Sequence, residues 1–306
     1  MRVLVLGAGA TGTYFGARLI QSGCVVSFLV RPARAEQLRR DGLRVRSAQG
    51  DFAGEVDILT QVPAAAQFDL ILLACKAYDL GAALAAIAPA VGPDSRVLPL
   101  LNGLRHLDLL DLAFGKSRVL GGLCHISVAL QPDGSVQHLG QMHRLTFGAR
   151  TADARLDTLT PALLAAPAEM HRSERIIDAM WEKFALLATL AAMTCLMRAS
   201  VGEIVATADG AALARRCYGE ACAVAAACGH AVADLVQAEA TTILTTPSSP
   251  LKASMLRDLQ RGATTEGEHI IGDLISRGDM YNIDMPLLRA AATHLRVYER
   301  ARDPAV

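Results

Sequence analysis

The fold is decided by the stretch Arg2–Gly12, which reads RVLVLGAGATG. Arg2–Leu6 is rich in valine and leucine and predicts a strand, and Thr11–Ser22 after it has helical character. A second apolar run, Val25–Val30, follows within about 30 residues, so the region reads as a βαβ unit. In that context Gly-x-Gly-x-x-Gly is a dinucleotide-binding fingerprint rather than merely a tight turn.

Each glycine of the fingerprint has a physical task. Gly7 allows the tight turn, Gly9 lets the main chain approach a pyrophosphate, and Gly12 lets helix and strand pack closely. The helix N-terminus offers free N–H groups and a positive dipole to the phosphates. We therefore expect the whole turn to bind the cofactor: Gly7, Ala8, Gly9, Ala10, Thr11 and Gly12.

The end of the second predicted strand distinguishes the cofactors. Sites for NAD place Asp or Glu about 20 residues beyond the fingerprint to hold the ribose hydroxyls. Here Arg31 follows the strand, Arg34 comes close behind, and no acid occurs until Glu36. A guanidinium suits a 2′-phosphate, so the sequence predicts NADP(H), unless both arginines are merely solvated loop residues.

Composition excludes several classes of protein. At 306 residues two domains are expected, and we divide them as 1–172 and 173–306. Thirty basic residues balance thirty acidic ones, which argues against a nucleic-acid partner. The seven cysteines are scattered without metal-ligand spacing, so we expect no metal site and reduced thiols in a cytoplasmic protein. The uncharged run Phe184–Met197 is too short to span a bilayer, so no membrane association is expected.

The segments that follow the fingerprint change in character along the chain. Leu43–Ser47 and Glu55–Thr60 alternate as a hairpin would, and Asp69–Cys75 is a continuous apolar run typical of a buried parallel strand. Beyond Ala152 strand signals almost vanish and long helical stretches take over. The predicted fold class is α/β, with an N-terminal Rossmann-type parallel-sheet domain followed by an all-helical C-terminal domain.

Four short motifs, added to the fingerprint and Arg31, resemble one known family. They are Cys75-Lys76-Ala77-Tyr78, Leu101-Asn102-Gly103, Trp181-Glu182-Lys183, and Ser254-Met255-Leu256-Arg257-Asp258 followed by Thr265-Glu266. The chain resembles the ketopantoate reductases (2-dehydropantoate 2-reductases) nearly end to end. The resemblance implies an NADP-dependent oxidoreductase of pantothenate biosynthesis that reduces a small 2-oxo acid, most simply 2-dehydropantoate to (R)-pantoate.

The resemblance also implies roles for individual residues. The catalytic residues would be Lys183 as proton donor, Glu266 and Asn102. Cofactor contacts beyond the turn would come from Arg31, Lys76, Asn102, Ser127 and Glu266. The substrate would be bound by Lys183, Leu187, Ala191, Lys252 and Ser254.

The residues themselves give physical support to two of these roles. Negative charge builds on the carbonyl oxygen during reduction of a ketone, and a lysine can stabilise that charge and supply a proton. Without the resemblance, Lys183 would read as a snorkelling lysine beside an apolar run. Glu266 is expected in the first turn of a helix, capped by a Thr265-x-x-Glu268 box, where the dipole favours a carboxylate.

One departure from the family leaves the substrate open. The family carries asparagines four and eight residues after the catalytic lysine, where this chain has Leu187 and Ala191. Both share a helix face with Lys183, so that wall is expected to be apolar. The alternatives are a dehydrogenase of another small hydroxy acid and a non-catalytic NADP(H)-binding regulator. The oligomeric state is also open, with a homodimer as one candidate.

Overall fold

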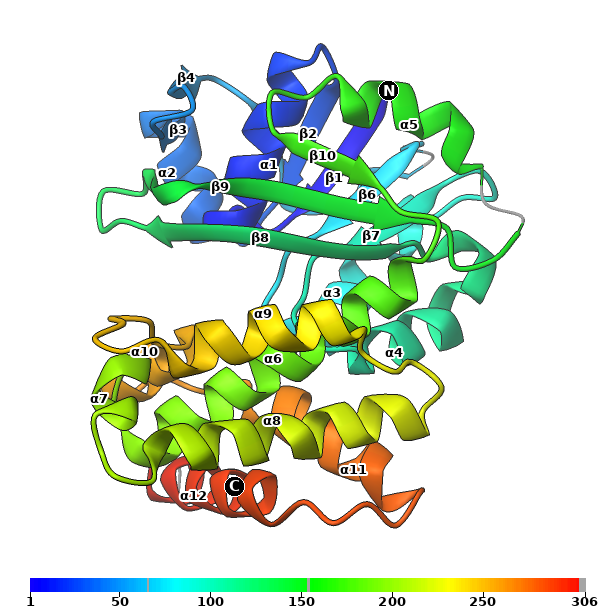
Figure 1. Cartoon of the computed structure of the whole chain (residues 1–306). Helices are drawn as coiled ribbons and strands as arrows, with labels where there is room; N and C mark the ends of the chain where they lie inside the picture. The colour runs from blue at the N-terminus through cyan, green and yellow to red at the C-terminus, as the bar shows by residue number, and fades with distance from the viewer. Residues whose placement is uncertain (65, 153–154, 303–306) are drawn as a thin grey trace. The chain divides into compact units, whose positions relative to one another are not determined.

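The computed structural model describes residues 1–64, 66–152 and 155–302. In these ranges the chain forms two compact units (Figure 1). Unit 1 comprises Met1–Leu101 and His106–Ile176, and unit 2 comprises Asn102–Arg105 and the chain from Ile177 onward. The predicted domain boundary between residues 172 and 173 stays a prediction.

Unit 1 is built on a parallel sheet, sheet A, with the strand order β5-β2-β1-β6-β7. Its strands are β1 (Arg2–Leu6), β2 (Val25–Leu29), β5 (Asp57–Leu59), β6 (Leu70–Leu73) and β7 (Arg96–Pro99). The chain adds β2 and β5 on one side of β1, then returns to add β6 and β7 on the other. This doubly wound topology confirms the predicted Rossmann-type domain.

A second sheet, sheet B, contains the longest strands of unit 1 (Figure 1). It consists of β3 (Leu43–Arg46), β4 (Phe52–Gly54), β8 (Gly121–Leu130), β9 (Val136–Gly148) and β10 (Glu169–Arg172). The antiparallel hairpin β8–β9 dominates it, and β9 also pairs in parallel with β3 and β10.

The predicted hairpin between residues 43–47 and 55–60 is wrong in its second strand. β3 pairs with β4 instead, whereas β5 joins sheet A in parallel with β2. The chain reverses tightly at Gly50, whose φ is +103°, and the main-chain N–H of Ser47 donates to Asp51 Oδ1 at 2.8 Å. This closed turn brings Phe52–Gly54 back beside β3, and Asp57 then accepts a hydrogen bond from the Ser27 hydroxyl of β2 at 2.5 Å.

Helix α1 (Ala10–Gln21), which opens from the fingerprint, packs against both sheets. Its residues from Gly12 to Leu19 are all buried, which explains why this helix carries so little charge. Tyr14 and Arg18 have partners outside the helix: Tyr14 is hydrogen-bonded to His143 of β9 at 2.8 Å, and Arg18 donates to the main-chain oxygen of Gly50, in the turn between β3 and β4, at 2.7 Å. The other helices of this part of the chain are α2 (Pro32–Asp41), α3 (Leu80–Ile87), α4 (Arg105–Phe114) and α5 (Leu156–Leu164), with short 3₁₀ turns at Ala77–Asp79, Ala88–Ala90 and Lys116–Arg118.

All regular secondary structure among the described residues of unit 2 is helical. Its helices are α6 (Ile176–Met197), α7 (Val201–Val205), α8 (Gly210–Ala227), α9 (Asp234–Thr245), α10 (Ser254–Gln260), α11 (Asp273–Asp279) and α12 (Pro286–Arg302), with a π-helical segment at Glu268–Gly272. Among the described helices α6 alone is long and apolar enough to cross a membrane, and 67% of its most apolar window is buried. That burial is typical of a core helix.

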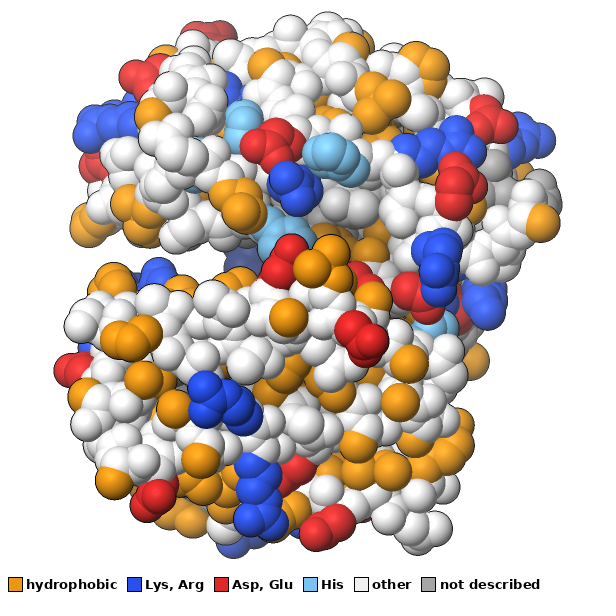
Figure 2. Space-filling view, viewed as in Figure 1, with side chains coloured by type: hydrophobic (Ala, Val, Ile, Leu, Met, Phe, Trp, Pro, Cys, Tyr) orange, Lys and Arg blue, Asp and Glu red, His pale blue; other side chains and the backbone are white. Residues whose placement is uncertain are grey.

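The surface carries charges of both signs. On the face drawn in Figure 2, basic and acidic side chains are interspersed, and no continuous basic stripe crosses the described residues there. The seven cysteines are free thiols, and within residues 1–64, 66–152 and 155–302 no cluster of His, Cys, Asp and Glu has the makings of a metal site.

Candidate functional site

The fingerprint turn lies where strand order reverses in sheet A, between β1 and its neighbours β2 and β6. In open α/β sheets, ligands bind outside the carboxyl ends of the strands at such a point. Gly7 has a φ of +92°, and its main-chain N–H donates to Leu29 at the end of β2. The first main-chain bond of α1 runs from Thr13 N–H to the Gly9 oxygen at 3.0 Å.

Gly9 and Gly12 of the turn differ in the space around them. A Cβ on Gly12 would lie 2.1 Å from the main-chain oxygen of Gly7 and 3.2 Å from the Cβ of Ala74, so only glycine allows this packing. A Cβ on Gly9 would meet nothing within 4 Å. The main chain at Gly9 is therefore open to an approaching phosphate, as the fingerprint predicts.

Arg31 lies at the N-cap of α2, directly after sheet A, with a side chain 76% exposed. Its Nη2 forms an ion pair with Asp79 Oδ1 at 2.5 Å. Asp79 ends the 3₁₀ turn that follows β6, and Lys76 is the N-cap of that same turn. The predicted cofactor residues Arg31 and Lys76 thus follow the two strands that flank β1, at the edge that carries the fingerprint.

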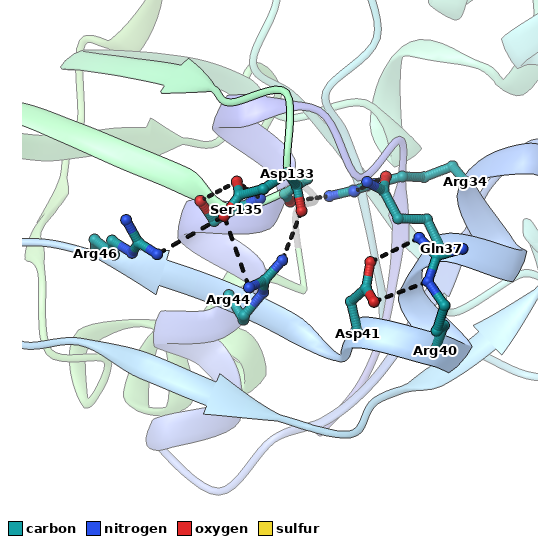
Figure 3. Close-up of polar contacts among 9 residues, drawn as sticks. Arg34, Gln37, Arg40, Asp41, Arg44, Arg46, Asp133 and Ser135 are labelled. Carbon is teal, nitrogen blue, oxygen red and sulfur yellow. Dashed lines mark hydrogen bonds and ion pairs between the residues drawn. The ribbon is translucent and has the colours of Figure 1, made fainter.

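Arg34, whose position after β2 suggests a phosphate contact, instead makes hydrogen bonds within the protein. Its Nε donates to the main-chain oxygen of Ala8 at 3.1 Å, and its two terminal nitrogens donate to Gln37 and to the Gly134 oxygen (Figure 3). Burial and, second, the charge of Arg44 lower the pKa of Arg34. This guanidinium ties the fingerprint turn to the β8–β9 turn.

The β8–β9 turn is itself held by further charged contacts. Arg44 donates to the Asp133 main-chain oxygen at 2.6 Å, and both Arg44 and Arg46 lie 3.7 Å from its carboxylate (Figure 3). The Ser135 side chain, more than any charge, lowers the pKa of Asp133 by donating a hydrogen bond to it. The sequence did not reveal this cluster, because its members come from three distant segments.

Ser127 lies on β8 where the pairing with β9 becomes irregular. Ile126 pairs with His143 but Val128 pairs with His138, so β9 carries the extra residues Leu139–Met142 opposite Ser127. Such bulges are over-represented next to active sites because they re-aim the main chain. Ser127 is an exposed residue, and its contact with the nicotinamide stays a prediction.

In unit 2, Lys183 and Asn102 lie together although 81 residues separate them. Lys183 Nζ donates to Asn102 Oδ1 at 3.2 Å, and both side chains are partly buried. Gly103 turns the chain with a φ of +81°, and a Cβ there would lie 3.4 Å from the main-chain oxygen of His269 and 3.6 Å from the Phe184 ring. The turn Asn102-Gly103 is therefore packed tightly beside the Lys183 helix.

His269 supports this turn and was not predicted. Its ring is hydrogen-bonded to the main chain of Asn102, and burial, the largest influence, lowers its pKa. It lies in the π-helical segment, a geometry common at functional sites. The sequence signal was its place three residues after Glu266, which is one helical turn.

Glu266 is buried, but the predicted capping box does not form. Glu266 lies just before the helical segment, whose N-cap is Gly267, and its main-chain oxygen accepts from Ile270 N–H at 3.0 Å. The hydroxyl and main-chain N–H of Thr265 donate to Glu299 at 2.7 Å, and Glu268 pairs with Arg296 instead. Stronger charged partners on α12 thus displace the local box.

The predicted substrate residues lie on two parts of unit 2. Leu187 is partly buried and Ala191 buried on α6, one and two turns beyond Lys183, and the apolar substrate wall stays a prediction. Ser254 is exposed at the first position of α10, and Lys252 is partly buried just before it. The loop before α10 is fixed by bonds from Val201 and Gly202 of α7 to Leu251 and Ser249, at 2.9 and 2.8 Å.

A doubly wound sheet with an open glycine turn, followed by a helical unit with a paired lysine, defines a class: the dinucleotide-dependent oxidoreductases. A family model described as ketopantoate reductase PanE/ApbA matches residues 3–152, and the model of its C-terminal part matches residues 175–299. The chain belongs to this ketopantoate reductase family, as its motifs predicted.

Individual relatives agree with that membership. An uncharacterized oxidoreductase, YkpB, of Bacillus subtilis (strain 168) is 36% identical over 98% of this chain and 99% of its own. The crystal structure of a PanE/ApbA family ketopantoate reductase from Ralstonia eutropha JMP134 is 28% identical, covers 99% of both chains and has a TM-score of 0.88. A D-mandelate dehydrogenase in ternary complex with NADH and anilino(oxo)acetate has the same fold, with a TM-score of 0.89, 23% identity and 99% coverage of both chains.

Proposed function

We propose that this protein is an NADPH-dependent reductase that converts a small 2-oxo acid to the 2-hydroxy acid, with 2-dehydropantoate or a close analogue as substrate. The observation that carries the proposal is the hydrogen bond from Lys183 Nζ to Asn102 Oδ1 at 3.2 Å. An amide oxygen orients the ammonium group without neutralising it, as a proton donor requires.

The proposed chemistry divides between cofactor and chain. NADPH supplies the hydride when bound. Lys183 stabilises the negative charge that builds on the carbonyl oxygen and then donates its proton there. Asn102 orients the ammonium, and His269, on which the charge of Glu266 acts, holds the Asn102 main chain. We propose Glu266 as the acid that accompanies this lysine in the reaction. Lys252 and Ser254 are the proposed ligands of the substrate carboxylate.

The preference for NADPH rests on Arg31. Its guanidinium is exposed after β2, where an NAD site would present an acid. Arg34 adds little, because its donors already serve Ala8, Gln37 and Gly134. We expect NADPH to bind about tenfold more tightly than NADH, which is about 1.4 kcal/mol from one phosphate contact.

The substrate is the finer part of the proposal. Leu187 and Ala191 present no hydrogen-bonding side chain on the face of α6 that carries Lys183, so a hydroxyl at the far end of the substrate gains little there. We expect ketopantoate to be reduced without strong preference over 2-oxo acids of similar size with a hydrocarbon tail.

The test is oxidation of NADPH with ketopantoate and 2-oxoisovalerate as substrates, scored as kcat/KM. Turnover of both within about tenfold of each other is expected. A non-catalytic NADP(H)-binding regulator would turn over neither, and the Lys183–Asn102 pair argues against that alternative because a sensor needs no proton donor. We further propose a cytoplasmic location, because the cysteines are free thiols. Whether the protein forms a homodimer is a question for a measurement of its mass in solution.

A further inference from the structure

The ion pair between Arg31 and Asp79 bears on cofactor choice. The two residues are 48 positions apart, yet Arg31 Nη2 and Asp79 Oδ1 lie 2.5 Å from each other. Arg31 follows β2 and Asp79 follows β6, the two strands that flank β1. Their pair therefore lies along the same sheet edge as the fingerprint turn, at the place where a ribose 2′ position is proposed to bind.

The Asp79 carboxylate is expected to affect the binding of NADP(H) and of NAD(H) differently. A 2′-phosphate carries a charge of about −1.5 to −2 at neutral pH, and Asp79 would stand beside it with a charge of the same sign. The phosphate also competes for the Arg31 Nη2 donor that Asp79 now occupies. A 2′-hydroxyl is neutral and can donate a hydrogen bond to a carboxylate, so NAD(H) meets neither cost.

We propose that Asp79 is a specificity-determining residue that opposes Arg31 and weakens the discrimination between NADP(H) and NAD(H). The proposal rests on the proposed nicotinamide cofactor and on Arg31 as its phosphate ligand. The Asp79 side chain is 34% exposed and that of Arg31 is 76% exposed, so the pair is accessible to a ligand that approaches Arg31.

The size of the effect of Asp79 on NADP(H) affinity can be estimated from its exposure to solvent. Two charges a few ångströms apart in a water-like medium interact by an amount equivalent to about fivefold in affinity, and an exposed ion pair is worth a similar factor. Asp79→Asn keeps the size and the hydrogen-bonding capacity of the side chain but removes the charge. The substitution should therefore raise the affinity for NADP(H), which carries the 2′-phosphate, about fivefold and leave the affinity for NAD(H) unchanged.

The chain offers a matched control. Asp41 pairs with Arg40 at 2.9 Å at the end of α2, the helix that Arg31 caps, and its side chain is 27% exposed. Asp41→Asn removes the same charge from an arginine pair but not from Arg31. It should leave both affinities unchanged within about twofold.

The experiment is calorimetric titration with 2′,5′-ADP and with 5′-AMP, which isolate the adenosine end and need no turnover. The proteins are wild type, Asp79→Asn, Asp41→Asn, Arg31→Ala and the Arg31→Ala/Asp79→Asn double variant. We expect Asp79→Asn to tighten 2′,5′-ADP about fivefold with 5′-AMP unchanged, and this gain to fall below about twofold without Arg31.

Two results would overturn the inference, and they are distinguishable. If 2′,5′-ADP binds but Asp79→Asn equals wild type or weakens binding, Asp79 does not oppose Arg31, and the proposed cofactor still stands. If 2′,5′-ADP binds to none of the proteins, the proposed cofactor is wrong and the inference fails with it.

Discussion

Alanine substitutions at Gly12 and Gly9 of the fingerprint turn should have different effects, the first on stability and the second on cofactor affinity. In Gly12→Ala the new methyl would lie 2.1 Å from the main-chain oxygen of Gly7, and that atom cannot yield because Gly7 is fixed between β1 and β2. Overpacking against a rigid main chain costs about 3 kcal/mol, which corresponds to a fall in Tm of about 6–12 °C for a unit of this size.

Gly9→Ala should behave in the opposite way. Its φ of −75° and ψ of −168° are open to alanine, and its Cβ would meet nothing within 4 Å, so the free energy of unfolding should change by less than about 0.5 kcal/mol. The methyl would, however, stand where the pyrophosphate approaches. We expect a loss of NADPH affinity of about tenfold or more.

Thermal unfolding without cofactor and fluorescence titration with NADPH measure the two effects. The expected outcome is one variant with normal stability and poor binding, Gly9→Ala, and one with low stability, Gly12→Ala. Normal NADPH affinity in Gly9→Ala would show that the open main chain at Gly9 is not the phosphate site.

Three further predictions concern the catalytic group, the substrate wall and the buried histidine. Lys183→Ala should lower kcat about 10²-fold or more with NADPH affinity unchanged; a normal kcat in steady-state assays would exclude Lys183 as proton donor. Leu187→Asn with Ala191→Asn should raise the ratio of kcat/KM for ketopantoate over 2-oxoisovalerate, and an unchanged ratio would exclude this wall from recognition. Burial, followed by His138 and Arg18, lowers the pKa of His143, so the folded state binds fewer protons than the unfolded chain. Stability should thus fall as pH drops below about 6.5, less steeply in His143→Gln, and equal slopes in urea unfolding would contradict the assignment.

Local patterns in the sequence predicted the parts of the fold that depend on local chemistry. The fingerprint and the apolar run of β6 identified sheet A, since a buried parallel strand needs continuous apolar residues. The same reasoning paired residues 55–60 with the wrong strand. Alternation indicates that a segment is a strand, but it does not show which strand it pairs with.

In the candidate site too, local motifs predicted individual residues, whereas contacts between distant residues were missed. Motifs predicted Lys183 and Asn102, and the structure brings the two side chains within hydrogen-bonding distance. The contact between Arg31 and Asp79 was missed, since nothing local links residues that follow β2 and β6. The capping box at Thr265 failed because Glu299, 34 residues away, offers the hydroxyl a charged acceptor.

The central claim is that the chain reduces a 2-oxo acid with NADPH and uses Lys183 as the acid. The most direct measurement follows NADPH consumed and 2-hydroxy acid formed in the same reaction, for wild type and for Lys183→Ala, with Lys116→Ala as an exposed-lysine control. We expect equal molar amounts of NADPH consumed and hydroxy acid formed, normal rates in the control, and a rate about 10²-fold lower in Lys183→Ala. NADPH that binds but is not oxidised by any 2-oxo acid, or equal rates in all three proteins, would contradict this claim.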